Sequence, residues 1–187
     1  MHVAGLLLAA GAGRRFGGPK ALAEGGRWLR GSAAVLAAGG CDPVRVVLGA
    51  AAEQARRLLA DPSVAVVADD WEQGMAASLR AGLRAAGELR PEPDAVLVHL
   101  VDLPDVTAAV IARLVGLGTG PQVLARATYR GRPGHPVLLG RAHWPGIAES
   151  VAGDAGARRW LDGRDDVLAV ECSDLAAGRD VDHRATR

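Results

Sequence analysis

Short apolar runs alternate with longer stretches of helical periodicity along the chain. The short runs resemble buried strands, and several of the helical stretches end at glycine or proline. This alternation is typical of an α/β domain with a mostly parallel sheet. The predicted strands cover residues 3–9, 44–48, 64–67, 95–100, 123–127, 136–139 and 167–171, and the predicted helices cover residues 32–38, 51–59, 75–86 and 107–117.

The composition limits what such a domain binds. The chain has 187 residues, 49% of them hydrophobic, and a formal net charge of +1. This length and apolar content suit one compact domain over residues 1–187. The small net charge gives no general attraction to nucleic acid or to an anionic membrane. A small-molecule partner is therefore expected.

The cysteines and the apolar start of the chain bear on its compartment. Cys41 and Cys172 lie far apart, without the paired spacing of a zinc or redox site, and are expected to be free thiols of a cytoplasmic protein. The apolar run 3–10 is too short to cross a bilayer and leads directly into a glycine-rich turn. We therefore expect no transmembrane segment.

Residues 6–20, LLLAAGAGRRFGGPK, join a buried strand to a glycine-rich turn with three cations, among them Arg15 and Lys20. Glycines let backbone N–H groups approach phosphate oxygens, and fixed cations offset the charge of a triphosphate. The spacing G-x-G-x-x-x-G from Gly11 fits neither a Walker loop nor a dinucleotide loop. The segment predicts a phosphate-binding loop of another kind, and a glycine-rich turn with solvated arginines is the alternative.

Lys20 is the only lysine in the chain, whose other basic residues in the count of 22 are arginines. A compact ammonium acts on phosphate as a point charge, which the planar fork of arginine does not reproduce. The lysine therefore favours a phosphate contact at this position, with a chance surface residue as the alternative.

Asp102 follows the continuous apolar run 95–100 in the sequence Asp102-Leu103-Pro104. A central strand here would deliver this carboxylate to the carboxyl edge of the sheet, where open α/β sheets bind ligands. A turn residue ahead of Pro104 is the alternative.

Taken together, these segments resemble the molybdenum-cofactor nucleotidyltransferase family. Residues 8–20 match the family's opening pattern, L-A-[AG]-G-x-[SG]-x-R-[MF]-G-x-x-K, at every fixed position. Four further segments are similar to its G-M-x-x-S-L, D-[ML]-P, G-H-P and G-D-x-G-A-R elements, and they lie in order at residues 74–79, 102–104, 134–136 and 153–158. The five matches cover most of the chain and favour the cytidylyltransferase branch over the guanylyltransferases.

The resemblance implies an α/β, three-layer Rossmann-like nucleotidyltransferase fold with a mostly parallel mixed sheet. It also implies Mg²⁺-dependent transfer of a nucleoside monophosphate from an NTP to a phosphorylated acceptor such as molybdopterin, with release of pyrophosphate. CTP is favoured over GTP because Ala10 occupies the position at which glycine would suggest guanine. The nucleotide contacts it implies are Leu8, Ala9, Ala10, Gly11, Gly13, Ser78 and His135.

The same resemblance assigns the charged residues. Arg15 and Lys20 would contact the phosphates and Asp102 would hold Mg²⁺, so these three are the predicted catalytic residues. The carboxyl end keeps an acid-apolar-acid triplet ending at Asp182, the predicted second metal ligand, but lacks the family's T-P-E-D continuation.

Three further positions have two interpretations each. Ser78 lies early in a helix whose apolar face would carry Met75, so its hydroxyl is expected to point away from the core toward a nucleotide, or to be satisfied at the helix start. His135 lies between Gly134 and Pro136. It is either a site residue whose backbone these neighbours fix, or an ordinary turn histidine. Arg158, near Asp154, lines an acceptor pocket or begins a helix.

Other functions remain open at this stage. A guanylyltransferase of the same family is one, and a non-catalytic nucleotide-binding accessory protein is another, although Asp102 argues for activity. A nicotinamide-dependent oxidoreductase is disfavoured by Lys20 and by the loop spacing. The expected partners are an NTP, a phosphorylated acceptor, and a molybdoenzyme or chaperone, with neither nucleic acid nor membrane.

Overall fold

The computed structural model describes residues 1–118 and 120–182. Seven strands form one sheet in the order β3-β2-β1-β4-β6-β5-β7, with β6 antiparallel to both of its neighbours and the other pairs parallel. The strands are β1 (Val3–Ala9), β2 (Val44–Leu48), β3 (Ala65–Val67), β4 (Ala95–Leu100), β5 (Leu124–Tyr129), β6 (Arg132–Gly140) and β7 (Leu168–Glu171). This is the predicted mostly parallel mixed sheet.

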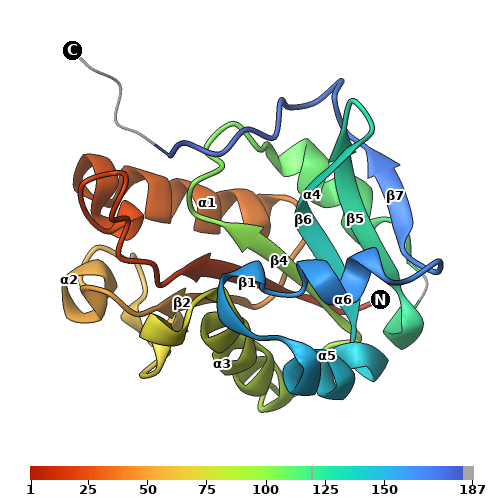
Figure 1. Cartoon of the computed structure of the whole chain (residues 1–187), viewed down its shortest axis with the longest axis horizontal. Helices are drawn as coiled ribbons and strands as arrows, with labels where there is room; N and C mark the ends of the chain where they lie inside the picture. Colours follow the sequence, from red (N-terminus) through yellow and green to blue (C-terminus); the bar gives the residue numbers. More distant parts are fainter. Residues whose placement is uncertain (119, 183–187) are drawn as a thin grey trace.

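Helices cover both faces of the sheet and make three layers (Figure 1). One face carries α1 (Arg27–Ala38) and α4 (Ala108–Val115), and the other carries α3 (Met75–Gly87), α5 (Trp144–Ser150) and α6 (Arg158–Asp162). The short α2 (Ala52–Arg56) lies near β2. A separate cluster of buried side chains fills each interface, because β1 and β4 are buried on both of their faces.

Several predicted boundaries were wrong, each for a local reason. Helix α1 begins at Arg27, five residues before the predicted start, because Leu29 packs fully buried under the sheet. Helix α2 ends at Arg56 rather than at residue 59. Strand β6 begins at Arg132, four residues before the predicted start, because its polar first half pairs with β5 across a tight turn. Helix α5 was not predicted, and of α6 only its start at Arg158 was given, as one of two interpretations of that residue.

The topology fixes where a ligand can meet the chain. Strands β1 and β4 are adjacent and parallel, with Leu8 opposite Leu100, so the loops that follow them leave the same sheet edge side by side. None of the helices in the two described ranges combines the length and the apolarity that crossing a bilayer requires.

Candidate active site

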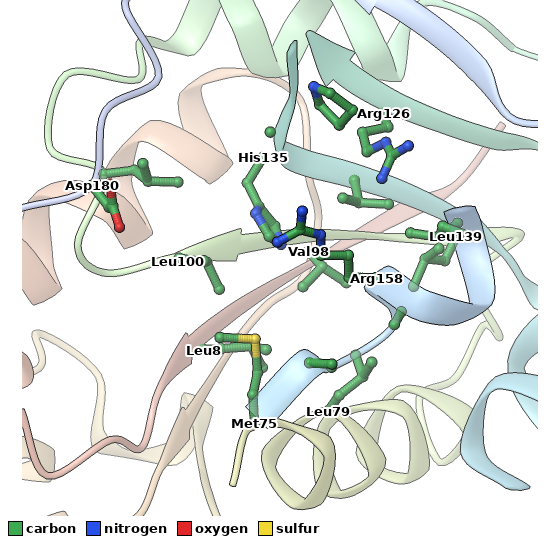
Figure 2. Close-up of a pocket in the computed structure, with 18 of the residues that line it drawn as sticks. Leu8, Met75, Leu79, Val98, Leu100, Arg126, His135, Leu139, Arg158 and Asp180 are labelled. Atoms are coloured by element: carbon green, nitrogen blue, oxygen red, sulfur yellow. The ribbon is translucent and has the colours of Figure 1, made fainter. Parts of the chain in front are cut away.

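A cavity of about 330 Å³ opens between the carboxyl ends of β1 and β4, strand β6, and the helices α3 and α6. Figure 2 shows Leu8, Leu100, Met75 and Leu79 along one side of it and His135 above them. Most of the lining is aliphatic, so the cavity suits an apolar group more than a chain of phosphates.

Two guanidinium groups lie at the far wall of this cavity. Arg126, on β5, donates to the carboxylate of Asp162 at 2.8 Å, and Arg158, on α6, lies 3.6 Å from the other oxygen of the same carboxylate. Arg126 is only 15% exposed, whereas Arg158 is 80% exposed and faces the opening. The wall therefore offers one fixed cation and one movable cation to an anionic group.

His135, on β6, is held against this cavity by Tyr129 of the neighbouring strand β5. The Tyr129 hydroxyl donates to the His135 carbonyl at 2.8 Å, and the ring of Tyr129 lies against Gly134, where a Cβ would approach it to 2.9 Å. Burial lowers the pKa of the imidazole to about 4, against an opposing effect of Asp102, so it is neutral at pH 7. A neutral imidazole can both donate and accept hydrogen bonds.

The glycine-rich loop after β1 closes on itself. The Gly13 carbonyl accepts from the backbone N–H groups of Gly17 and Gly18 at 2.9 and 3.0 Å. Gly13 has φ 59°, and a Cβ there would lie 1.9 Å from the Gly18 carbonyl oxygen, so no other residue fits. Phe16 packs on Trp28 with ring centroids 5.2 Å apart, which fixes the loop onto α1.

Four predicted site residues meet where this loop ends. The Lys20 ammonium donates to Asp102 at 2.8 Å and to Asp182 at 3.2 Å, and Arg15 lies 3.1 Å from the other oxygen of Asp182. Burial opposes the charge of Lys20, but the hydrogen bonds and charges of Asp102 and Asp182 outweigh burial and raise the lysine pKa. The cluster therefore keeps its charges by mutual pairing.

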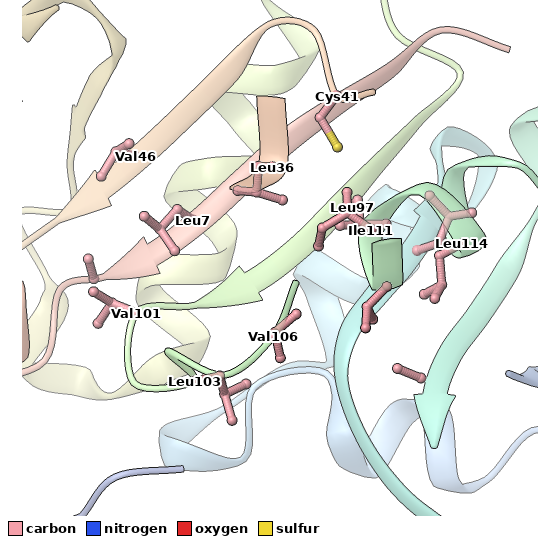
Figure 3. Packing of buried hydrophobic residues seen from close by; sticks show 14 of the residues in the cluster. Leu7, Leu36, Cys41, Val46, Leu97, Val101, Leu103, Val106, Ile111 and Leu114 are labelled. Atoms are coloured by element: carbon pink, nitrogen blue, oxygen red, sulfur yellow. The ribbon is translucent and has the colours of Figure 1, made fainter. Parts of the chain in front are cut away.

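Asp102 is fixed by the chain on both sides of it. Val101 and Leu103 insert into the core on the α1 and α4 face (Figure 3). The Asp102 carbonyl accepts from the Val181 N–H at 2.9 Å, which brings the C-terminal segment and Asp182 across the site. The carboxylate is thus presented at the sheet edge with little freedom of the backbone that carries it.

The carboxylates fit a magnesium ion. Asp102 Oδ1 is buried and has no hydrogen-bond partner within residues 1–118 and 120–182, while Oδ2 and Asp182 share the lysine ammonium. Those residues contain no group of three or more metal-ligating side chains. Divalent metal ions in phosphoryl-transfer sites are bound by one or two carboxylates with water and substrate phosphates, so Asp102 and Asp182 could serve as such ligands.

The remaining predicted nucleotide contacts do not all lie at the cavity. Leu8 lines the cavity, Ala9 is buried beneath the loop, and the Ala10 carbonyl accepts from Ala50 N–H at 2.9 Å. The expectation that Ser78 points away from the core is corrected: it is only 5% exposed, in a helix that packs on β2 and also contacts residues 153–155 and α5.

The motifs at residues 74–79 and 153–158 pack against each other. A Cβ on Gly74 would lie 2.4 Å from Asp154 Oδ1, and one on Gly156 would lie 3.0 Å from the sulfur of Met75. Asp154 therefore packs closely against Gly74, while Arg158 lines the cavity. The family's T-P-E-D continuation would follow Asp182, and residues 183 and 184 at its start lie outside the described residues.

Two polar residues escaped the sequence analysis. Arg126 reaches the cavity from the predicted strand 123–127, which is otherwise apolar, and His99 is fully buried in β4 with neither ring nitrogen hydrogen-bonded to a described residue. In both cases the available signal was a single polar side chain inside an apolar run, because a buried strand rarely carries one without a local reason.

A glycine-rich loop and a strand-end carboxylate at one edge of an α/β sheet define the class: this is the nucleotidyltransferase fold. A family model described as the MobA-like NTP transferase domain matches residues 5–167. The chain belongs to this family.

Three relatives extend the comparison. The chain is 38% identical over 192 residues to nicotine blue oxidoreductase of Paenarthrobacter nicotinovorans, covering 96% of this chain and 92% of that one. It is 30% identical, with TM-score 0.81, to a Mycobacterium sp. strain JC1 homologue of Rv0371c, covering 97% and 90% of the two chains. Rv0371c of Mycobacterium tuberculosis, solved in complex with manganese, is 26% identical with TM-score 0.75, covering 92% and 89%.

Proposed function

We propose that this protein transfers CMP from CTP to a phosphorylated acceptor of the molybdopterin type, in a Mg²⁺-dependent reaction that releases pyrophosphate. The observation that carries the proposal is the ammonium of Lys20 between Asp102 and Asp182 at the end of the glycine loop. A cation beside two carboxylates and a loop of backbone donors suits a triphosphate with its metal.

The bonds form and break between the two substrates, and the protein positions them and neutralises their charge. An oxygen of the acceptor phosphate attacks the α-phosphorus of CTP, a new P–O bond forms, and the bond to the bridging oxygen breaks as pyrophosphate leaves. Positioning and charge neutralisation carry such reactions. Lys20 and Arg15 would hold the phosphates, while Asp102 and Asp182 would hold Mg²⁺, which supplies charge neutralisation when bound.

The 330 Å³ cavity would hold the acceptor beside the loop. Its aliphatic walls suit a planar heterocycle, and Arg158 faces its opening. The manganese complex of Rv0371c supports a divalent metal in the family. The cytoplasm is the proposed compartment, since Cys41 and Cys172 are both free thiols, and a molybdoenzyme or chaperone is the proposed protein partner.

The decisive experiment measures pyrophosphate release from each NTP with a panel of phosphorylated acceptors, with and without Mg²⁺. We expect release that requires both an acceptor and the metal, fastest with CTP. Faster release with GTP would favour the guanylyltransferase. Nucleotide binding without release from any pair would favour the accessory protein.

A second candidate is an oxidoreductase, because the relative that is 38% identical bears that name and the cavity suits a planar heterocycle. Oxidation of reduced nicotinamide cofactors with a panel of planar dyes tests it. Turnover there, with no pyrophosphate release in the first assay, would replace the transferase proposal.

A further inference from the structure

A second groove lies next to the candidate active site. It has a volume of about 660 Å³ and runs between the turn that joins β5 to β6 and the segment after β7. Three arginines line it, Arg130, Arg132 and Arg179, together with one acid, Asp180. The chain as a whole carries a net charge of only +1, so these cations form a local positive cluster.

The arginines of this groove form no ion pairs within the described residues. None of the three guanidinium groups has a hydrogen bond or an ion pair with another residue of the described ranges. Other arginines near these strands do, as Arg113 with Asp174 and Arg126 with Asp162 show. The groove thus presents donor groups that the fold itself leaves unused.

One wall of the groove is held by the carboxylate of Glu171. Glu171 accepts from the backbone N–H groups of Arg130 and Gly131 at 3.0 and 3.1 Å, and from the Thr128 hydroxyl at 3.0 Å. Arg130 and Gly131 have φ values of 54° and 73°, which form a tight hairpin turn. The carboxylate therefore fixes the turn through its backbone and stays away from the guanidinium groups.

The opposite wall is held by a second carboxylate. Asp105 Oδ2 accepts from the N–H groups of Ala177 and Gly178, each at 2.9 Å. Gly178 has φ 63° and lies against the ring of Tyr129, where a Cβ would come to 2.2 Å. Arg179 follows directly, so it leaves a fixed segment and faces the hairpin turn across the groove.

The groove is continuous with the active-site cavity. Pro133, Gly134, Gly178 and Asp180 line both spaces. A ligand that fills the cavity can therefore extend past these residues into the cluster of arginines without leaving the surface of the protein.

We infer that the groove bounded by Arg130, Arg132 and Arg179 binds a second anionic group, a phosphate, carried by the acceptor whose other end occupies the active-site cavity. Guanidinium forks match phosphate oxygens in pairs, and two fixed walls reduce the entropic cost of bringing them together. The inference rests on the proposed function, since it assigns the nucleotide's own phosphates to the glycine loop.

Backbone amide NMR can separate the two sites with simple probes. The protein is first saturated with CTP without divalent metal, and inorganic pyrophosphate is then titrated as a stand-in for the acceptor's phosphate. Pyrophosphate here represents the acceptor's second phosphate and not the one that attacks CTP. We expect CTP to shift the signals of Gly11, Gly13 and Gly17, and pyrophosphate to shift those of Gly131, Ser173 and Gly178.

The test variant is Arg132→Ser/Arg179→Ser, which takes one cation from each wall and spares the strained turn at Arg130. The matched control is Arg57→Ser/Arg84→Ser, which removes two exposed arginines outside both cavities. Pyrophosphate affinity of the groove should fall at least about ten-fold in the test variant, because charge-assisted contacts are lost, and remain within about two-fold in the control.

The outcomes are distinct. Groove signals that shift with CTP alone would mean that the nucleotide occupies the groove and would overturn the assignment to the acceptor. Pyrophosphate shifts confined to the glycine loop, or lost equally in both variants, would overturn the groove site itself. Failure of CTP to shift the loop, with the groove still binding pyrophosphate, would instead count against the proposed function.

Discussion

Two basic side chains lie in the field of Asp102, and their pKa values shift in opposite directions. Lys20 lies in contact with this carboxylate and with Asp182, and the pairing raises its pKa in spite of burial. His135 also feels the charge of Asp102, but burial dominates and lowers its pKa to about 4. A direct hydrogen bond to a charge preserves ionisation, whereas an electrostatic effect without one does not overcome desolvation.

The comparison divides the site into two environments. The loop side, with Arg15, Lys20, Asp102 and Asp182, holds permanent charges and suits phosphates and metal. The cavity side, with the neutral His135 among aliphatic side chains, suits an uncharged ring. We expect substitutions on the loop side to change kcat and those that alter burial on the cavity side to change stability.

The largest effect is expected at Asp102. Asp102→Asn keeps the shape of the side chain but removes its charge, so kcat should fall by a factor on the order of 10², since an electrostatic contact of the transition state is lost. Single-turnover kinetics with Mg²⁺ and CTP measure this loss. The control Asp165→Asn changes an exposed carboxylate and should leave kcat unchanged. Normal turnover of Asp102→Asn would remove the loop side from the mechanism.

Lys20 comes next. Lys20→Ala removes the cation shared by Asp102 and Asp182 and a contact to the phosphates, so kcat/KM should fall roughly ten-fold to a hundred-fold, corresponding to about 1.5 to 3 kcal/mol. Lys20→Arg should restore part of the activity, because a planar fork replaces a compact ammonium poorly. Full activity of Lys20→Ala would show that the loop cluster is structural.

The two histidines with lowered pKa values should make folding sensitive to acid. Burial lowers the pKa of His99 to about 3 and that of His135 to about 4, whereas both titrate near 6.5 in the unfolded chain. As the pH falls below about 6.5, the unfolded chain binds more protons than the folded protein. The free energy of unfolding should then decrease by up to about 1.4 kcal/mol per pH unit for each histidine.

Urea denaturation at several pH values measures this slope. His99→Phe should reduce it by about half, and His143→Phe, at a partly exposed imidazole that is hydrogen-bonded to the Gln122 carbonyl, serves as the control. An unchanged slope in His99→Phe would mean that the pKa of His99 is not lowered in the folded protein.

The smallest effect is expected at Ala10. CTP should bind more tightly than GTP, and Ala10→Gly should narrow the difference by about 1 kcal/mol, roughly five-fold. Calorimetry with each nucleotide and Mg²⁺ measures the two affinities. Equal affinities in the unmodified protein would contradict the cytidylyl preference while leaving the loop side intact.

The parallel half of the sheet was predictable because its strands are short, continuous apolar segments of the sequence. Residues 3–9, 44–48 and 95–100 have the predicted boundaries, since each run is buried by its neighbours in the sheet. The adjacency of Lys20 and Asp102 followed from the rule that parallel strands end at one edge. These positions depend on local pattern and on one topological rule.

The antiparallel half was less predictable. The polar residues at the start of β6 carry no apolar alternation, and their strand conformation comes from pairing with β5 across the turn at Arg130 and Gly131. Ser78 is buried in α3, whose neighbours include α5, a helix that its own sequence did not reveal. The cavity, which draws Arg126 and Arg158 from different elements, depends on that packing and was visible only in three dimensions.

The ion pair between Lys20 and Asp182 joins residues that are 162 positions apart. Contacts between such distant parts of a chain form late in folding, because the closure of a long loop costs entropy before the contact offsets it. On the ribosome the glycine loop emerges early, but this pair must await nearly all of the described chain. Measurement of nucleotide binding during refolding would therefore report the last step of folding and not the formation of the sheet.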